Sequence, residues 1–193
     1  MTPSVAPRIA QGDLNEFNQC QTQLLPLRRM GLGNKKVIME FAAYRVLYAV
    51  QNRDPQELLR ELGTLTPEEL QHPFVQHAMD VQASLTAGNY ARFFHLYRTT
   101  PNMGSYVLDK MLLRERVRAL TKMAKAYAPT IPVALVTKQL AFVSDEAAAE
   151  FMTKAGCVLE TRGDTLVFVT KTSKVAMFKE QLTQKEIHDG AAR

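Results

Sequence analysis

Helix starts marked by proline divide the first half of this chain into short segments. The Asp-Pro pair at 54–55 and the Thr-Pro pair at 66–67 each place a capping side chain before a proline, with a glutamate that can bond back toward the cap. The His-Pro pair at 72–73 opens a further helix, which Gly88-Asn89 ends. Helices this short cannot bury their apolar faces alone, so they must stack on one another.

Hydrophobic spacing predicts three more helices in this half, at 14–24, 36–52 and 90–98. The second is expected to bury a set of large residues at helical spacing: Val37, Phe41, Tyr44 and Tyr48. A loop that holds Pro26 and two glycines is predicted between the first two helices. We expect residues 14–98 to form a TPR-like array of stacked helical hairpins. An irregular helical bundle is the alternative, because no repeated sequence signature is present.

A longer helix is predicted from Asn102 to Tyr127, ahead of a proline. Its apolar side is expected to consist of Leu113, Val117, Leu120, Ala124 and Tyr127. Another side carries basic residues at spacings of three and four: Lys110, Arg114, Arg118, Lys122 and Lys125. We call these five residues the basic stripe. Such a stripe follows the phosphates of a nucleic acid or is a solvated helix face.

Beyond residue 130 the periodicity changes from that of helices to that of strands. Two short helices are predicted first, at 133–142 and, behind a serine cap, at 145–155. Strands are then predicted at 157–161 and 165–170, on either side of an Arg-Gly-Asp loop. Helix, turn, helix and hairpin is the order of elements in a winged helix.

The predicted fold class is therefore mainly α, a stacked helical-hairpin (TPR-like) array followed by a C-terminal winged helix. The expected domain boundaries are a helical array at 1–128, a winged-helix subdomain at 129–172, and a C-terminal helix and tail at 173–193. Most of the net charge of +5 arises late, since residues 101–193 hold 14 Lys and Arg against 10 Asp and Glu. A surface for nucleic acid or an acidic partner should lie in that half.

Composition restricts the cellular setting. Two cysteines, Cys20 and Cys157, give no disulfide framework and suit a reducing compartment, where both are expected to be small buried apolar residues. No stretch of about 20 apolar residues and no signal-peptide order is present, so neither a membrane association nor export is expected.

The sequence offers no support for an enzyme. The four histidines show no HExxH pattern and no spacing with cysteine that suits a metal, and no GxSxG, P-loop or GxGxxG motif is present. No catalytic residue, metal or cofactor is therefore expected.

Four segments carry a resemblance to a known family. The run EFNQCQTQL at 16–24 looks like a signature of the GANP / suppressor-of-actin family. The segments at 40–48, 88–94 and 131–142 resemble the motifs that follow it, so the resemblance covers roughly residues 9–170. Within the family, the chain is most similar to the branch that contains leukocyte receptor cluster member eight.

The resemblance implies a PCI-type fold and a scaffolding role. By that likeness the chain would belong to a nuclear complex in mRNA processing, export or transcription-coupled mRNP assembly, with the cytoplasm as a second location. The implied partners are a second PCI-domain protein, a small acidic Sem/DSS-type peptide, and RNA or single-stranded nucleic acid. Family members usually carry helices upstream of the first segment. In relatives, the helix that contains this segment tends to continue past the position that Pro26 occupies here.

Two sets of candidate site residues follow. The candidate nucleic-acid contacts are the basic stripe with four residues of the winged module: Lys138, Arg162, Lys171 and Lys174. The stripe is alternatively a dock for the acidic peptide. The candidate partner contacts lie on the last strand, which is apolar on both faces: Leu166 and Phe168 on one, Val167 and Val169 on the other. A protein partner or a helix at 174–182 is expected to cover the outer face.

Two other functions remain open at this stage. One is a PCI subunit of a proteasome-lid, signalosome or translation-initiation complex, which the 16–24 segment disfavours. The other is a winged-helix DNA-binding regulator. The predicted second short helix of the module offers Asp145, Glu146 and Glu150 against only Lys154, and such a helix would repel phosphates.

Overall fold

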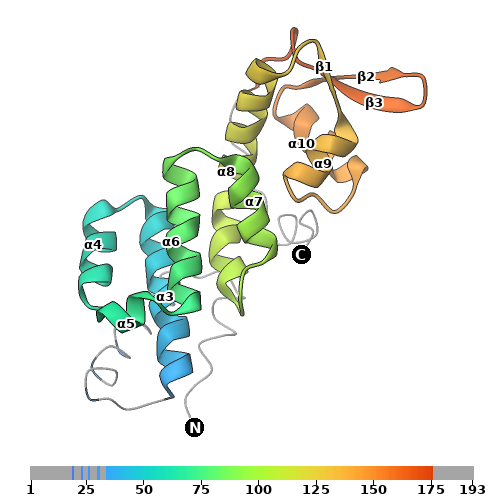
Figure 1. Ribbon diagram of the computed structural model, residues 1–193. Helices are drawn as coiled ribbons and strands as arrows, with labels where there is room; N and C mark the ends of the chain where they lie inside the picture. The colour runs from blue at the N-terminus through green and yellow to red at the C-terminus, as the bar shows by residue number, and fades with distance from the viewer. Residues whose placement is uncertain (1–18, 20–22, 24–25, 27–29, 31–33, 176–193) are drawn as a thin grey trace. The chain divides into compact units, whose positions relative to one another are not determined.

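A computed structural model describes residues 34–175, together with residues 19, 23, 26 and 30 (Figure 1). These residues form two compact units, each with its own core. The first comprises residues up to Asn89 together with Thr99–Lys110, and the second comprises Tyr90–Arg98 together with residues from Met111 onward. The domain boundaries expected at 128 and 172 stay a prediction.

The helix starts of the first unit lie where the sequence predicts them. Helix α4 (Pro55–Gly63) begins behind Asp54, whose carboxylate accepts the N–H groups of residues 56 and 57. Helix α5 (Pro67–Leu70) has a capping box, and α6 (Pro73–Thr86) is capped by the His72 ring. Each cap satisfies backbone donors that a helix start leaves unpaired. The predicted starts of these three helices are confirmed.

Helix α3 (Lys35–Asn52) is the centre of the first unit and lies between α4 and α6 (Figure 1). Its buried residues surround most of the helix: Met39, Ala42, Ala43, Tyr44, Arg45, Val46, Leu47, Ala49 and Val50. The predicted buried set is wrong for Val37, which is exposed, and for Phe41 and Tyr48, which are half-buried. A helix covered by two neighbours has no single apolar stripe, and spacing alone therefore misplaces its inner side.

Tyr44 ties α3 to the segment that precedes the long helix. Its hydroxyl donates to the Glu40 carboxylate and accepts the Met103 N–H at 2.9 Å. Burial, followed by the Glu40 hydrogen bond, raises the pKa of Tyr44 well above its usual range. The phenol therefore stays neutral and holds residues 99–103 against α3.

The second unit contains α7 (Tyr90–Arg98), the later turns of α8 (Gly104–Ala126), and a small sheet with two helices. Helices α9 (Val133–Gln139) and α10 (Asp145–Lys154) cover one side of the sheet (Figure 1). Ser144 caps α10 as predicted, with its hydroxyl accepting the Ala147 N–H at 3.2 Å. The mainly α fold class is confirmed.

The predicted hairpin is confirmed, and the structure adds a third strand. Strands β2 (Val158–Arg162) and β3 (Thr165–Val169) are antiparallel, with Leu159 opposite Phe168. Strand β1 (Thr130–Pro132) pairs with the other edge of β3, so the order is β1-β3-β2. Three residues that end in a proline give no recognisable strand pattern, so sequence reasoning missed β1.

The chain after β3 returns to the start of β2. The Ser173 hydroxyl accepts the Val158 N–H at 2.7 Å and donates to the Val169 carbonyl at 2.5 Å. Gly156 has φ +83°, and a Cβ there would lie 2.6 Å from the Lys174 carbonyl oxygen. Only glycine tolerates both conditions without strain. Lys174 is not helical, and the rest of the helix expected at 174–182 lies outside the described residues, apart from position 175.

Only part of the segment at 16–24 is described. Gln19 and Gln23 are helical and exposed, and the rest of this family segment lies outside the described residues. Pro26 is also helical, and its carbonyl accepts the Met30 N–H at 3.1 Å. The prediction that Pro26 lies in a loop is therefore wrong.

Cys157 is buried as predicted, and burial raises the pKa of its thiol to about 12. The thiolate is the reactive form, so we expect iodoacetamide at about pH 8 to leave Cys157 unmodified in the folded protein and to alkylate it in urea. Peptide mass mapping measures Cys157 separately from Cys20, which lies outside the described residues. Equal labelling of Cys157 with and without urea would contradict its burial.

Candidate binding surface of the second unit

The buried side of α8 determines which residues of this helix face the solvent. Residues with at most 3% exposure along this helix are Val107, Leu108, Asp109, Met111, Leu112, Arg116, Val117, Ala119, Leu120 and Met123. Val117 and Leu120 are therefore confirmed as core. Leu113 and Ala124 are only half-buried, and Tyr127 lies past the helix end and is 41% exposed, so the predicted apolar side is partly wrong.

Arg116 is a buried cation that sequence reasoning left out. Its Nη2 donates to the Ala141 carbonyl at 2.6 Å and its Nε to the Leu140 carbonyl at 3.2 Å. The guanidinium also lies 3.9 Å from the centre of the Phe142 ring. Arg116 thus holds the turn between α9 and α10, where Ala141 adopts φ +52°. An arginine within a helix that is rich in exposed basic residues gives no sequence signal of burial.

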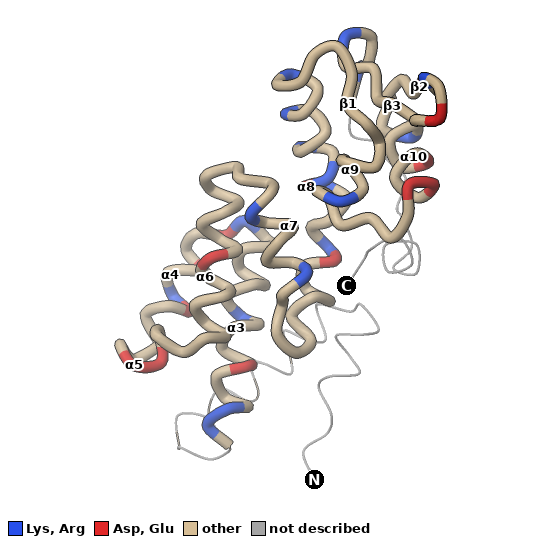
Figure 2. The backbone as a smooth tube through the Cα atoms, turned by 45° about the vertical axis from the view of Figure 1, so that its right-hand side comes forward, with Lys and Arg blue, Asp and Glu red and all other residues tan. Residues whose placement is uncertain are grey.

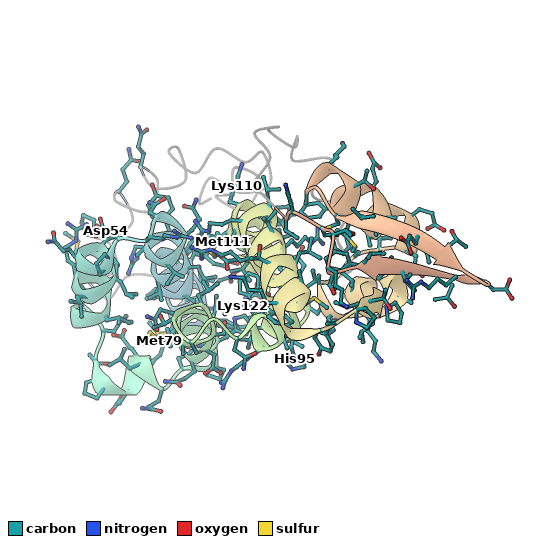
Figure 3. The ribbon with its side chains drawn as sticks, turned by 90° about the horizontal axis from the view of Figure 1, so that it is seen from above. Asp54, Met79, His95, Lys110, Met111 and Lys122 are labelled. Atoms are coloured by element: carbon teal, nitrogen blue, oxygen red, sulfur yellow. The ribbon has the colours of Figure 1, made fainter. Side chains whose placement is uncertain are left out.

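The α8 basic stripe is not uniform. Lys110 is half-buried and belongs to the first unit, whereas the other four residues belong to the second. Arg114 and Arg118 both bind the buried Glu115 carboxylate, at 2.9 and 3.0 Å. Lys122 and Lys125 are exposed near the helix end. Figure 2 shows Lys and Arg positions in blue along the backbone of α8, and Lys110 and Lys122 both project from α8 in Figure 3. Part of the positive charge in the stripe is therefore neutralised within the protein.

A second group of basic residues lies on α7. One side of this helix is core, where Phe93, Phe94 and Tyr97 are buried. The other side of the helix carries Arg92, His95 and Arg98, all exposed. Arg98 Nη1 donates to the Lys138 carbonyl on α9 at 2.7 Å. The i, i+3, i+6 spacing of these residues in the sequence is a signal that could have found them.

The remaining predicted cations surround the hairpin. Arg162, at the hairpin loop, is exposed and forms an ion pair with Glu160 at 3.3 Å. Lys171 and Lys174 are exposed on the returning segment, and Lys138 is exposed at the end of α9. All four lie in the second unit, which also contains four of the five residues of the α8 basic stripe.

The candidate partner residues on β3 are not a free edge. Strand β3 lies in the centre of the sheet, and Val167, Phe168 and Val169 are buried at 7%, 0% and 8% exposure. Leu166 is half-buried. Strand β1 pairs with the edge of β3 that the hairpin leaves open. The contact of these four residues with a partner stays a prediction. Among the described apolar residues near β3, Val158 on β2 is exposed at 39%.

Neither a metal centre nor a membrane helix is found among the described residues. No three His, Cys, Asp or Glu side chains in residues 34–175 come together in a way that could hold a metal ion. None of the described helices combines the length and apolar character needed to cross a bilayer.

These features define a mainly helical protein whose second unit contains a small helix-and-sheet module and several exposed basic residues. The sequence pattern of the SAC3/GANP family matches residues 11–161. The chain therefore belongs to the SAC3/GANP family, as its resemblance at four segments predicts.

Three curated relatives align with most of this chain. It is 36% identical over 166 residues to the THP3 homolog of Schizosaccharomyces pombe, which covers 86% of this chain and 41% of that protein. It is 40% identical over 144 residues to the leukocyte receptor cluster member 8 homolog of Xenopus laevis, with 75% and 18% covered. SAC3 family protein A of Arabidopsis thaliana is 34% identical, with 86% and 18% covered. The chain thus spans less than half the length of each of these relatives.

Proposed function

We propose that this chain is the nucleic-acid-binding and partner-binding part of a non-enzymatic scaffold in a nuclear complex for mRNA processing or export. Family membership supports the setting, and the absence of catalytic motifs in the sequence supports a role in assembly. The observation that carries the proposal is the set of exposed cations in the second unit, on a surface held by its own buried core.

The module at the end of the chain is proposed to be a PCI-type winged helix. Its order of elements, β1-α9-α10-β2-β3, supports this, as does the antiparallel hairpin in the position of a wing. The helical first unit is proposed to be the stacked-hairpin part of the same PCI fold. Its partners would be a second PCI-domain protein and a small acidic Sem/DSS-type peptide.

A winged-helix regulator that reads duplex DNA is the weaker alternative. Helix α10 exposes Asp145, Glu146 and Glu150, and Lys154 is paired with Glu150 at 3.3 Å. A helix with this charge is repelled by the phosphates that line a major groove. The other alternative, a subunit of a proteasome-lid, signalosome or translation-initiation complex, would use the same fold with different partners.

The nucleic-acid function predicts a steep dependence on salt. We expect fluorescence anisotropy with a labelled single-stranded RNA to give a slope of log affinity against log salt near −3, as for about four phosphate contacts. An acidic peptide is the competing ligand, and the same titration is repeated with it present. Absence of RNA binding at low salt, with the peptide bound, would overturn the nucleic-acid role and leave the scaffold role standing.

Arg114 and Arg118 are poor residues for testing this role. Reversing their charges would place three carboxylates around the buried Glu115 site, so we expect lower stability as well as weaker binding. Substitutions of exposed residues that do not bind a buried carboxylate would change binding without lowering stability.

A further inference from the structure

The segment that follows β3 is held by hydrogen bonds at the end of the sheet. Thr170 donates both its backbone N–H and its hydroxyl to the Pro129 carbonyl, at 3.0 and 2.9 Å. Further along, the Lys174 N–H donates to the Gly156 carbonyl at 3.3 Å, next to the bonds that Ser173 makes with β2 and β3. This segment is therefore fixed both to the connection between α8 and β1 and to the start of β2.

Three exposed lysines lie at this end of the module. Lys171 and Lys174 are exposed on the fixed segment, and Lys125 is exposed in the last turn of α8. Thr130, which begins β1 shortly after α8, pairs with Val169, so the end of α8 and the end of β3 reach the same end of the sheet (Figure 1). We call Lys125, Lys171 and Lys174 the lysine cluster.

Acidic side chains do not neutralise the lysine cluster within the described part of the chain. The sequence contains no Asp or Glu between 116 and 144 or between 165 and 175. On the neighbouring elements, the carboxylates of Glu115, Glu150 and Glu160 each bind a basic residue of their own element. The remaining acids of the module, at the start of α10 and in the β2–β3 loop, lie at the far ends of these elements. The charge of the lysine cluster is therefore available to a ligand.

An exposed aromatic ring lies two residues beyond Lys125. Tyr127 directly follows α8, and its side chain is 41% exposed and hydrogen-bonded to Tyr90. A cationic surface beside an exposed aromatic ring is the arrangement that binds single strands, because phosphates meet the cations and an unpaired base stacks on the ring. An acidic peptide would use the cations but would gain nothing from base stacking.

We propose that the lysine cluster, with Tyr127, is the primary contact for single-stranded RNA in this protein. This inference rests on the proposed nucleic-acid function and moves its centre from the α8 basic stripe to the end of the sheet. The RNA backbone follows the three lysines, and one base stacks on Tyr127. The hydrogen bonds of the segment after β3 favour binding, because its backbone needs no ordering when the RNA arrives.

Two matched double charge reversals test the proposal. Lys171→Glu with Lys174→Glu changes the lysine cluster, and Lys138→Glu with Arg162→Glu makes the same charge change at the end of α9 and at the hairpin loop. We expect the first to weaken single-stranded RNA binding more than about 30-fold and to reduce the salt slope by about 1.4, and the second to weaken it less than about 5-fold.

A single reversal on α8 keeps the proposal testable if the first double variant does not fold. Lys125→Glu leaves the segment after β3 unchanged, and we expect it to weaken single-stranded RNA binding about 5-fold and to reduce the salt slope by about 0.7. Lys138→Glu is its matched control and should weaken binding less than about 2-fold. Circular dichroism melting of each variant shows whether it is folded.

Tyr127→Ala supplies a separate readout. We expect it to weaken single-stranded RNA binding about 10-fold without changing the salt slope, because stacking releases no counterions. The proposal is overturned if a control variant loses as much affinity as the matching variant of the lysine cluster, or if the cluster variant keeps RNA but loses an acidic peptide. If the unaltered protein shows no salt-dependent RNA binding, the proposed nucleic-acid function fails first.

Discussion

Arg116→Met is expected to lower the free energy of unfolding of the second unit by about 3 kcal/mol or more. Arg116 is 3% exposed and donates to two backbone carbonyls, those of Leu140 and Ala141. Methionine fills a similar volume but donates no hydrogen bond, so both buried carbonyls lose this donor. The loss of the cation–π contact with Phe142 adds to the effect.

Urea denaturation followed by circular dichroism measures this change. Lys125→Met is the matched control, because Lys125 is exposed on the same helix, and it should change stability by less than about 0.5 kcal/mol. Arg116→Lys should fall between the two, since one ammonium cannot satisfy both carbonyls with the geometry of a guanidinium. Equal stability of the methionine variant and the unaltered protein would show that Arg116 does not hold the α9–α10 turn.

Glu61→Leu is expected to destabilise the first unit by about 3 to 5 kcal/mol. The Glu61 carboxylate binds Arg45 at 2.5 Å, and both residues are nearly buried, at 8% and 9% exposure. Removing the acid leaves a cation between α3 and α4 without its counter-charge. The cost of that uncompensated buried charge exceeds the loss of the contact itself.

A double variant distinguishes the buried charge from the lost volume. Arg45→Met with Glu61→Leu removes both charges, and we expect it to regain most of the stability lost in the single variant. Glu57→Leu is the control, because Glu57 pairs with the exposed Arg60 and such pairs contribute less than about 1 kcal/mol. A double variant no more stable than Glu61→Leu would mean that packing, and not charge, dominates at this site.

Local chemistry made many elements of this fold predictable. A capping side chain followed by proline defines a helix start within a few residues, and this was enough for α4, α5 and α6. The Ser144 cap and the Gly163 loop likewise located α10 and the β2–β3 hairpin. These signals are readable because they depend on backbone groups only two or three residues away. The family was also predictable, since consecutive motifs identify it.

The binding surface was only partly predictable from the sequence. Periodicity located the α8 basic stripe, but it could not show that Glu115 is buried between two of its arginines or that Arg116 points inward. The basic side of α7 was hidden because its aromatic residues dominate the pattern. Charges on separate helices combine into one surface only when the helices pack together, and Arg98 reaches Lys138 across 40 residues of sequence.

The sequence by itself determined where most of the described helices and the hairpin begin, which family the chain belongs to, and that its later half is basic. Tertiary structure alone decided which strand is central, which side of α3 is buried, and which cations remain available. Strand β1 shows why: its three residues carry no strand signal, and they become a strand only because β3 offers an open edge beside them. Caps and turns depend on near neighbours in sequence, whereas burial and charge neutralisation depend on residues that only folding brings together.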